Sequence, residues 1–217
     1  MLEKLTDMNT ALRDSLKRAY ANMVAQRGAS QPQTWKLGDQ ERFLQMIKAE
    51  EAKTLIEVGA GTGQDAAFFA SNGLDVLAID LTEENVAACR QKGLRAEVMD
   101  VCDLRLPASI FDAAYSLNCL LHLPKSEFPI ALDNIHRLLK PGGLFYLGIY
   151  GGVEREGVYE EDTYEPKRFF SFWTDEALKA KLIPRFEILR FENIDIGNQD
   201  GLGFQSLILR KPRQGQS

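Results

Sequence analysis

The sequence has few of the residues from which disulfide frameworks and metal sites are built. Its 217 residues include three cysteines, an odd number with no C-x-x-C pair, and two histidines. The cysteine pattern is not that of a disulfide-stapled secreted domain, and it fits a reducing compartment. Two histidines without a cysteine pair also disfavour a zinc site built by the protein alone. We therefore expect no bound metal.

Long apolar runs and an excess of basic charge are missing as well. No apolar run approaches the ~20 residues that span a bilayer. The N-terminal segment MLEKLTDMNTALRDSLKR mixes charges throughout, unlike a signal peptide. The formal net charge is −5 with no long basic stretch, which disfavours sequence-independent binding of nucleic acid. We therefore expect a cytoplasmic protein that binds neither nucleic acid nor a membrane.

Short apolar runs alternate with helix-like segments from Thr54 onward. The runs lie at 54–58, 74–80, 94–99, 111–117 and 143–150, and the helix-like segments begin near Gln64, Thr82 and Lys125. Strands and helices that alternate with short connections are typical of a parallel sheet covered on both faces. Right-handed crossovers then predict a doubly wound sheet.

The two ends of the chain depart from this alternation. Apolar residues recur at helical spacing over 5–26, and a second short helix is expected over about 39–50. Near the C-terminus, two strand-like runs (184–196 and 203–212) are separated only by GNQDGL, which leaves no room for a helix. The expected fold class is therefore α/β: a doubly wound, mostly parallel seven-stranded sheet that ends in an antiparallel hairpin, with an N-terminal helical cap.

This pattern predicts two parts within a single chain. The helical cap segment spans residues 1–50, and the core spans residues 51–217 with an insertion at about 151–172. The length suits one good-sized domain rather than two.

The most informative segment is a glycine-rich loop after the first expected strand. Glycine occupies every second position in Gly59-Ala60-Gly61-Thr62-Gly63, and a helix follows. Glycines let the backbone approach a ligand closely, and the N-terminus of the helix presents free N–H groups. A plain turn does not need three alternating glycines, so the pattern favours a binding site.

A dinucleotide site is the main alternative, because residues 61–66 match the form G-x-G-x-x-A. Two features argue against it. The match starts two residues later than the strand end suggests, and Glu57 lies within the strand. Burying an acid costs several kcal/mol unless a group pairs with it. A cationic group such as the α-ammonium of an amino acid would compensate, directly or through water.

At this point the sequence resembles a known family. LIEVGAGTG is similar to the first signature of the class I S-adenosylmethionine-dependent methyltransferases, an acidic residue followed by G-x-G-x-G. Four later segments resemble the further signatures in the same order: LDVLAIDLT, AEVMDVCDL, FDAAYSLNCLLHL and LLKPGGLFYLGIY. The resemblance covers about residues 50–211, and five segments in register are hard to obtain by accident.

The resemblance implies S-adenosylmethionine as the cofactor and names the residues expected to bind it. Asp80 would accept the ribose hydroxyls, Asp100 would meet the adenine amino group, and Tyr20 would lie near the methionine end. The expected set is Glu57, Gly59, Ala60, Gly61, Thr62, Gly63, Asp80, Leu81, Asp100, Val101, Asn118 and Tyr20. Asp80 could instead cap a helix, and Asp100 could simply form a turn.

His122 follows the fourth strand, at the edge where such sheets bind ligands. It is a candidate general base, and the alternative is packing beside the cofactor. We expect a methyltransferase that acts on a small molecule by in-line displacement. The aromatic and acidic insertion is either a solvated surface loop that docks by its aromatics, the interpretation that its acids favour, or a lid over the acceptor whose acidity would favour an amine. The alternatives are a nicotinamide-dependent oxidoreductase and a non-catalytic S-adenosylmethionine-binding protein.

Overall fold

A seven-stranded mixed sheet forms the centre of the molecule in the computed structural model, which describes residues 2–24, 26, 34–197 and 201–213. The strand order is β3-β2-β1-β4-β5-β9-β8, in which β9 pairs antiparallel with both β5 and β8 and the other neighbouring strands pair parallel. The strands are β1 (Thr54–Val58), β2 (Asp75–Asp80), β3 (Arg95–Val98), β4 (Phe111–Leu117), β5 (Leu139–Gly151), β8 (Glu187–Asp195) and β9 (Gly203–Arg210). The predicted fold class is confirmed, including the terminal β8–β9 hairpin.

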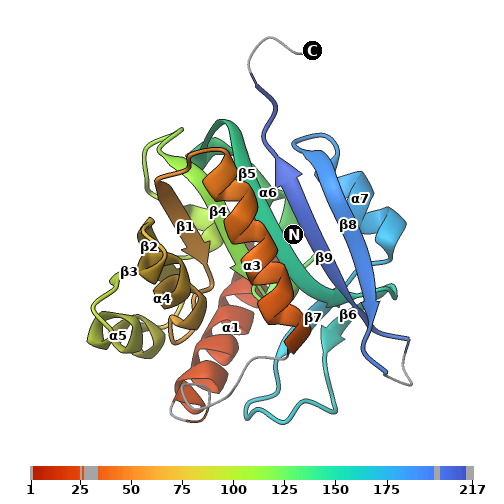
Figure 1. The fold of residues 1–217 in the computed structure, drawn as a ribbon. Coiled ribbons are helices and arrows are strands. Elements are labelled where there is room, and N and C mark those ends of the chain that lie inside the picture. Colours follow the sequence, from red (N-terminus) through yellow and green to blue (C-terminus); the bar gives the residue numbers. More distant parts are fainter. Residues whose placement is uncertain (1, 25, 27–33, 198–200, 214–217) are drawn as a thin grey trace.

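Helices cover both faces of this sheet, as Figure 1 shows. The helices are α1 (Leu2–Ala21), α3 (Thr34–Ala49), α4 (Gln64–Ser71), α5 (Glu83–Gln91), α6 (Phe128–Leu138) and α7 (Asp175–Leu182), with short 3₁₀ turns η1 (Val101–Asp103) and η2 (Leu120–His122). Successive residues of β5 alternate between two buried clusters. Tyr146 packs with α3 and α4 on one face, and Phe145 and Leu147 pack with α6 on the other. Both faces of a central strand are thus apolar, as a doubly covered sheet requires.

The insertion contains a structure that the sequence pattern did not predict. β6 (Arg155–Val158) and β7 (Phe169–Phe172) pair antiparallel as a separate two-stranded sheet, followed by α7. The hairpin and the lower part of α1 lie at the same end of the main sheet, beyond β1 and β4 (Figure 1). Two segments outside the repeating strand–helix pattern therefore flank the carboxyl edge of the parallel strands.

The N-terminal helices differ in extent from the expected ranges. The helix expected over 5–26 is observed as α1, which begins at Leu2 and ends at Ala21. The second helix, expected over about 39–50, begins earlier, at Thr34. The side chains of residues 2–8, 34 and 35 lie outside the described part of the structure.

Candidate functional site

The glycine-rich loop is held tightly against β2 and the loop after β4. Gly59, Gly61 and Gly63 have φ values of 76°, 54° and 77°, which favour glycine over other residues. The backbone N–H groups of Gly59 and Ala60 both donate to the carbonyl of Ile79 at 2.9 Å. A Cβ atom at Gly59 would lie 2.4 Å from the Cβ and Sγ atoms of Cys119. The loop therefore leaves no room for a side chain at this position.

Asp80 connects the glycine-rich loop to the start of α5. Its Oδ2 accepts a hydrogen bond from the Gly61 N–H at 2.8 Å, and its Oδ1 accepts bonds from the Thr82 N–H, the Thr82 hydroxyl and the Asn85 amide. Thr82 is itself the N-cap of α5, since its hydroxyl accepts from the Asn85 N–H at 3.3 Å. Asp80 thus orders the loop and does not cap the helix, while its side chain also lines a cavity.

Glu57 lies beneath the glycine-rich loop and outside the lining of that cavity. It is 2% exposed, and its Oε2 has no hydrogen-bond partner within the described residues. Burial, and next the nearby charge of Asp65, raise the pKa of Glu57, which the hydrogen bond from the Ala66 backbone only partly offsets. A direct contact between this carboxyl group and a ligand ammonium stays a prediction.

Two adjoining compartments open at the carboxyl edge of the sheet. The first is about 70 Å³ and extends along β2 toward η1, and the second is about 60 Å³ and extends toward α5. The residues common to both linings are Leu16, Gly59, Asp80, Leu81, Cys119 and His122. Pockets for small molecules usually measure about 300–1,000 Å³. Helix α1 forms one wall of both compartments, so its position limits their size.

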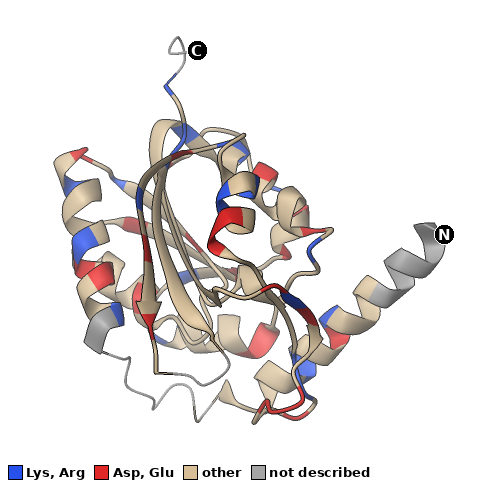
Figure 2. Cartoon of the chain, turned by 90° about the vertical axis from the view of Figure 1, so that its right-hand side faces the viewer, with Lys and Arg blue, Asp and Glu red and all other residues tan. Residues whose placement is uncertain are grey.

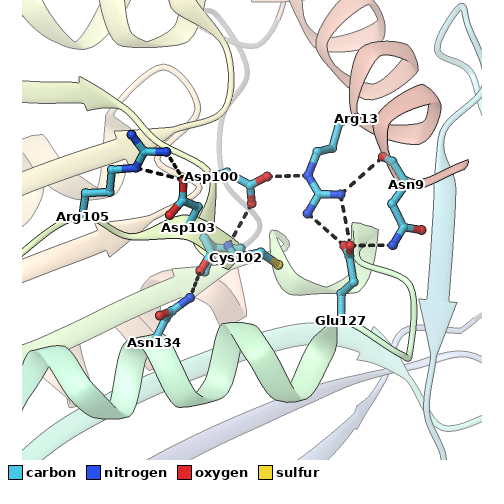
Figure 3. Close-up of polar contacts among 9 residues, drawn as sticks. Asn9, Arg13, Asp100, Cys102, Asp103, Arg105, Glu127 and Asn134 are labelled. Carbon is cyan, nitrogen blue, oxygen red and sulfur yellow. Dashed lines mark hydrogen bonds and ion pairs between the residues drawn. The ribbon is translucent and has the colours of Figure 1, made fainter. Parts of the chain in front are cut away.

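Arg13 fastens that wall to the core (Figure 3). Its guanidinium forms an ion pair with Asp100 and donates to the Glu127 carboxylate at 2.9 and 3.2 Å. The side-chain amide of Asn9, one turn earlier on α1, also donates to Glu127 at 2.6 Å. Burial disfavours the charge of Arg13, but the bonds to both carboxylates raise its pKa above the ordinary value. One cation therefore joins α1 to η1 and to the start of α6.

Asp100 also has the local role that its position in a turn suggests. Its Oδ1 accepts from the Cys102 N–H at 2.8 Å and so caps η1 (Figure 3). The carbonyl of the neighbouring Val101 accepts from the Asn134 amide at 3.0 Å. Both residues line the first compartment. The turn-forming role of Asp100 and its expected contact with a ligand are therefore compatible.

Tyr20, His122 and Arg168 form a hydrogen-bonded chain at the second compartment. The Tyr20 hydroxyl lies 2.7 Å from His122 Nε2, and an Arg168 N–H donates to the same hydroxyl at 3.0 Å. His122 Nδ1 lies 2.9 Å from the carbonyl of Phe169, which can only accept. Nδ1 therefore carries the proton, and in a neutral imidazole Nε2 accepts from Tyr20.

Arg168 comes from the insertion and is fixed there by Asp162. Two guanidinium nitrogens donate to Asp162 at 2.7 and 2.8 Å, and the guanidinium carbon lies 3.5 Å from the ring centroid of Tyr164. Burial disfavours the charge of Arg168, but the bonds to Asp162 raise its pKa above the ordinary value. The insertion therefore directs a fixed positive charge toward Tyr20.

Asn118 directly follows β4 in a left-handed conformation, with φ of 53°. Its Oδ1 is buried and has no hydrogen-bond partner in the described part of the chain, and the residue lines the second compartment beside Tyr20. An unpaired buried amide oxygen is costly, and its carbonyl could accept a bond from a ligand N–H group.

The structure brings most of the sequence-derived site residues to one edge. The residues that line a compartment are Gly59, Asp80, Leu81, Asp100, Val101, Asn118, Tyr20 and His122, whereas Glu57, Ala60, Gly61, Thr62 and Gly63 lie behind them in β1 and the loop. Sequence reasoning missed Arg13, Glu127 and Arg168, because their partners are far away in the sequence or lie in the insertion. The pairing of Arg13 with Asp100 spans 87 residues, and no local pattern reveals it.

Within the residues that the structure describes, no group of three or more His, Cys, Asp or Glu side chains could hold a metal ion. The same residues include no helix of the length and apolar character needed to cross a membrane.

The segment that forms this edge of the sheet matches a known protein family. Residues 56–147, which run from β1 through most of β5 and include the loop, Asp80, Asp100 and His122, match the "Methyltransferase domain" family. This segment is thus similar in sequence to methyltransferase domains. The match covers three of the five sequence segments on which the resemblance was based, and most of the first and the last.

Individual relatives agree with this assignment but differ in reaction. A malonyl-[acyl-carrier protein] O-methyltransferase of Pectobacterium atrosepticum is 30% identical over 48% of this chain and 41% of its own length. An S-adenosyl-L-methionine-dependent Diels-Alderase of Talaromyces variabilis is 28% identical over 59% of this chain and 46% of its own length. The chain thus spans less than half the length of these curated relatives.

One solved methyltransferase shares its fold with nearly the whole of this chain. The 1,6-didemethyltoxoflavin-N1-methyltransferase of Burkholderia thailandensis, solved with its substrate and S-adenosylhomocysteine, superposes with a TM-score of 0.69 at 22% identity. The match covers 94% of this chain and 90% of that one. At this level of identity the likeness concerns the fold.

Proposed function

We propose that the chain is an S-adenosylmethionine-dependent methyltransferase that transfers a methyl group to a small-molecule acceptor by in-line displacement. The observation that carries the proposal is the meeting of the glycine-rich loop, Asp80, Asp100 and the Tyr20–His122 pair at one edge of the sheet. A methyl group on a sulfonium is already activated, so positioning the acceptor supplies most of what the protein must contribute.

The residues at this edge fit the cofactor. The close approach at Gly59 creates a cradle that a Cβ would fill, and the buried Asn118 Oδ1 offers an acceptor for an ammonium group. Asp80 would hold the ribose hydroxyls, and Asp100 with the Val101 backbone would hold the adenine. When bound, S-adenosylmethionine supplies the methyl group. Both compartments are small, so α1 would have to move outward to admit it.

His122 is the proposed proton acceptor. The Phe169 carbonyl fixes the proton on Nδ1, which leaves the Nε2 lone pair on the side of Tyr20 and the second compartment. Tyr20 would pass its own proton to Nε2 and take up the proton released by the acceptor, so that the proton reaches His122 through the Tyr20 hydroxyl. Arg168 would stabilise negative charge on the Tyr20 oxygen during this transfer.

The remaining sequence expectations stay proposals. The division into a cap over 1–50 and a core over 51–217, a cytoplasmic location and the absence of a nucleic-acid partner belong to this group. Basic and acidic residues are interspersed along the chain in the view of Figure 2, which supports a small acceptor over a polyanion. The second candidate is a protein that binds S-adenosylmethionine without transferring its methyl group. The Diels-Alderase among the relatives favours this candidate.

Ligand-induced thermal shifts test the proposal. S-adenosylhomocysteine at ~100 times its dissociation constant should add about 2.7 kcal/mol and raise the melting midpoint by roughly 5–10 °C. NADH should produce no shift, and Asp80→Ala should abolish the shift with the adenosyl compound. A shift with NADH alone would overturn the cofactor assignment. Turnover of S-adenosylmethionine with a panel of acceptors separates the enzyme from the non-catalytic candidate.

A further inference from the structure

The β6–β7 hairpin presents three aromatic rings on one face. Tyr159, Phe170 and Phe172 form this cluster, which we call the hairpin cage. The centroids of Phe170 and Phe172 lie 5.5 Å apart with the rings nearly parallel, and the Tyr159 ring meets both edge-on at 5.7 and 6.3 Å. A cavity of about 280 Å³, larger than either compartment at the carboxyl edge, is lined by these rings.

The strand register explains why the hairpin cage is open. Gly157 pairs with Phe170 across the hairpin, and a Cβ at Gly157 would meet no atom within 4 Å. A larger residue at that position would stand on the same face as the rings, because side chains opposite each other in a strand pair share a face. Glycine therefore leaves the space in front of Phe170 unfilled.

A cation already lies against these rings. The guanidinium carbon of Arg155 is 5.1 Å from the Tyr159 centroid and 5.0 Å from the Phe172 centroid. The Arg155 residue is exposed, whereas Phe172 is 3% exposed. Cations within about 6 Å of aromatic faces are attracted by the ring quadrupole, and clusters of such rings bind alkylammonium groups. Arg155 thus shows that the cage accepts a positive group of similar size.

Acidic side chains lie beside the hairpin cage, and one ring of the cage packs against the candidate active site. Glu160 and Glu161 line the same cavity, and Glu161 accepts a hydrogen bond from the Tyr159 hydroxyl at 3.2 Å. On the other side, the Phe170 ring lies 4.6 Å, centroid to centroid, from the His122 ring. The Phe170 ring therefore lies between the cavity of the cage and His122, the proposed proton acceptor.

We propose that the hairpin cage binds the alkylammonium group of a small organic cation, which displaces Arg155, and that the same molecule is the methyl acceptor. The ammonium nitrogen has no lone pair, so the methyl group would pass to a neutral oxygen or nitrogen elsewhere in that molecule, and the proton released there would pass toward His122. The second half of the proposal rests on the proposed function, whereas cation binding stands on the cage alone. The chemistry selects a positive head group with apolar substituents, since the ring faces attract the charge and contact the substituents.

An NMR titration of the intact protein tests the inference. Choline is the probe, and 3,3-dimethylbutan-1-ol, which has the same shape without the charge, is the comparison ligand. We expect choline to shift the ring resonances of Tyr159, Phe170 and Phe172, with a much smaller effect of the neutral alcohol. Equal binding of the two ligands would mean an apolar surface only and would overturn the proposal.

Two variants give opposite expected outcomes. Arg155→Ala removes the internal occupant, so choline should bind about 2- to 5-fold more tightly. Tyr159→Leu removes one ring, so choline should bind more weakly by a similar factor. Arg95→Ala, at a half-exposed arginine on β3, is the matched control and should change nothing. Unchanged choline binding in Arg155→Ala would mean that Arg155 merely stacks on the surface, and would contradict the proposal.

S-adenosylhomocysteine thermal shifts on the same samples separate the two proposals. If these shifts persist while choline fails to bind, the cage inference is wrong and the cofactor assignment stands. If choline binds the cage without any adenosyl-ligand shift, the cation site stands and its link to methyl transfer fails.

Discussion

Tyr20 on α1 and His122 on η2 share a hydrogen bond of 2.7 Å although 102 residues separate them. The Phe169 carbonyl holds the proton on Nδ1, and an Arg168 N–H donates to the Tyr20 oxygen at 3.0 Å. Donor and acceptor roles are therefore determined at each position of the chain when His122 is neutral. The direction of each bond runs from Arg168 to Tyr20 and from Tyr20 to His122.

The first prediction concerns this direction. Nitrogen-15 NMR at a pH where His122 is neutral should show the Nδ1–H tautomer, which is the less common form of a free histidine side chain. Tyr20→Phe removes the hydroxyl that bonds to both neighbours, and should lower the free energy of unfolding by about 1–2 kcal/mol. Observation of the Nε2–H tautomer in the wild-type protein would contradict the assignment of Nε2 as the proton acceptor.

The second prediction concerns Arg13. Arg13→Ala leaves Asp100 and Glu127 without their shared cation, so α1 should detach more easily from the core. Amide hydrogen exchange over residues 9–21 should accelerate, and S-adenosylhomocysteine should dissociate about 10-fold faster, which corresponds to ~1.4 kcal/mol. Arg18→Ala, an exposed arginine of the same helix, should leave both quantities unchanged. Equal effects of the two variants would mean that the net charge of α1 determines both quantities and that the ion pairs of Arg13 with Asp100 and Glu127 do not.

The third prediction uses two glycines with nearly equal backbone angles. Gly59 and Gly93 have φ values of 76° and 78°, but an added Cβ meets Cys119 at 2.4 Å in the first case and nothing within 4 Å in the second. Gly93→Ala should cost only the ~1 kcal/mol of the left-handed backbone. Gly59→Ala should cost several kcal/mol and weaken S-adenosylhomocysteine binding, as measured by chemical denaturation and calorimetry. Similar costs would mean that the loop relaxes freely away from Cys119.

The fourth prediction is a pH dependence. Burial raises the pKa of Asp65 to about 6, while the Gln40 side chain and the charge of Lys36 oppose the shift. Between the ordinary value of 3.8 and about 6, the unfolded chain loses this proton before the folded chain does, so stability falls as pH rises. Asp65→Asn should match the wild type near pH 4 and exceed it above pH 6 by at most about 3 kcal/mol.

Denaturant unfolding of both proteins from pH 4 to pH 8 measures this difference. Asn keeps an oxygen that can accept the bond from Gln40, so the hydrogen bond is preserved while the charge is removed. The nearby charge of Asp65 also contributes to the raised pKa of Glu57, and the substitution should lower that pKa as well. A difference between the proteins that does not vary with pH would contradict the assignment.

The repeating core could be predicted from the sequence because its signals are local. The expected strand over 54–58 coincides with β1, and the one over 111–117 coincides with β4, since each is a short apolar run bounded by turn residues. α7 was missed although its signal is present. Thr174 caps it through the Ala177 N–H, acidic residues fill its first turn, and lysines fill its last.

The site could be predicted only in part. Residues at or beyond the ends of strands, such as Asp80 and His122, reach the same edge because parallel strands align their carboxyl ends. The β6–β7 hairpin escaped prediction because β6 is a four-residue strand with the sequence REGV, which combines charges and a glycine and lacks apolar alternation. Its pairing depends on the aromatic partner strand and on contacts with the core, such as the Ser171 hydroxyl donating to the Leu123 carbonyl at 2.6 Å.

Helix α1 carries both Arg13, which reaches Asp100 at one end of the edge, and Tyr20, which reaches His122 at the other. The two positions are seven residues apart, so about two helical turns span the whole site. A shortened protein that begins at Thr34 would retain every methyltransferase signature yet lack one wall of its own pocket. Such a fragment would be a poor reagent for acceptor screening, and libraries that vary specificity should include α1 together with the hairpin.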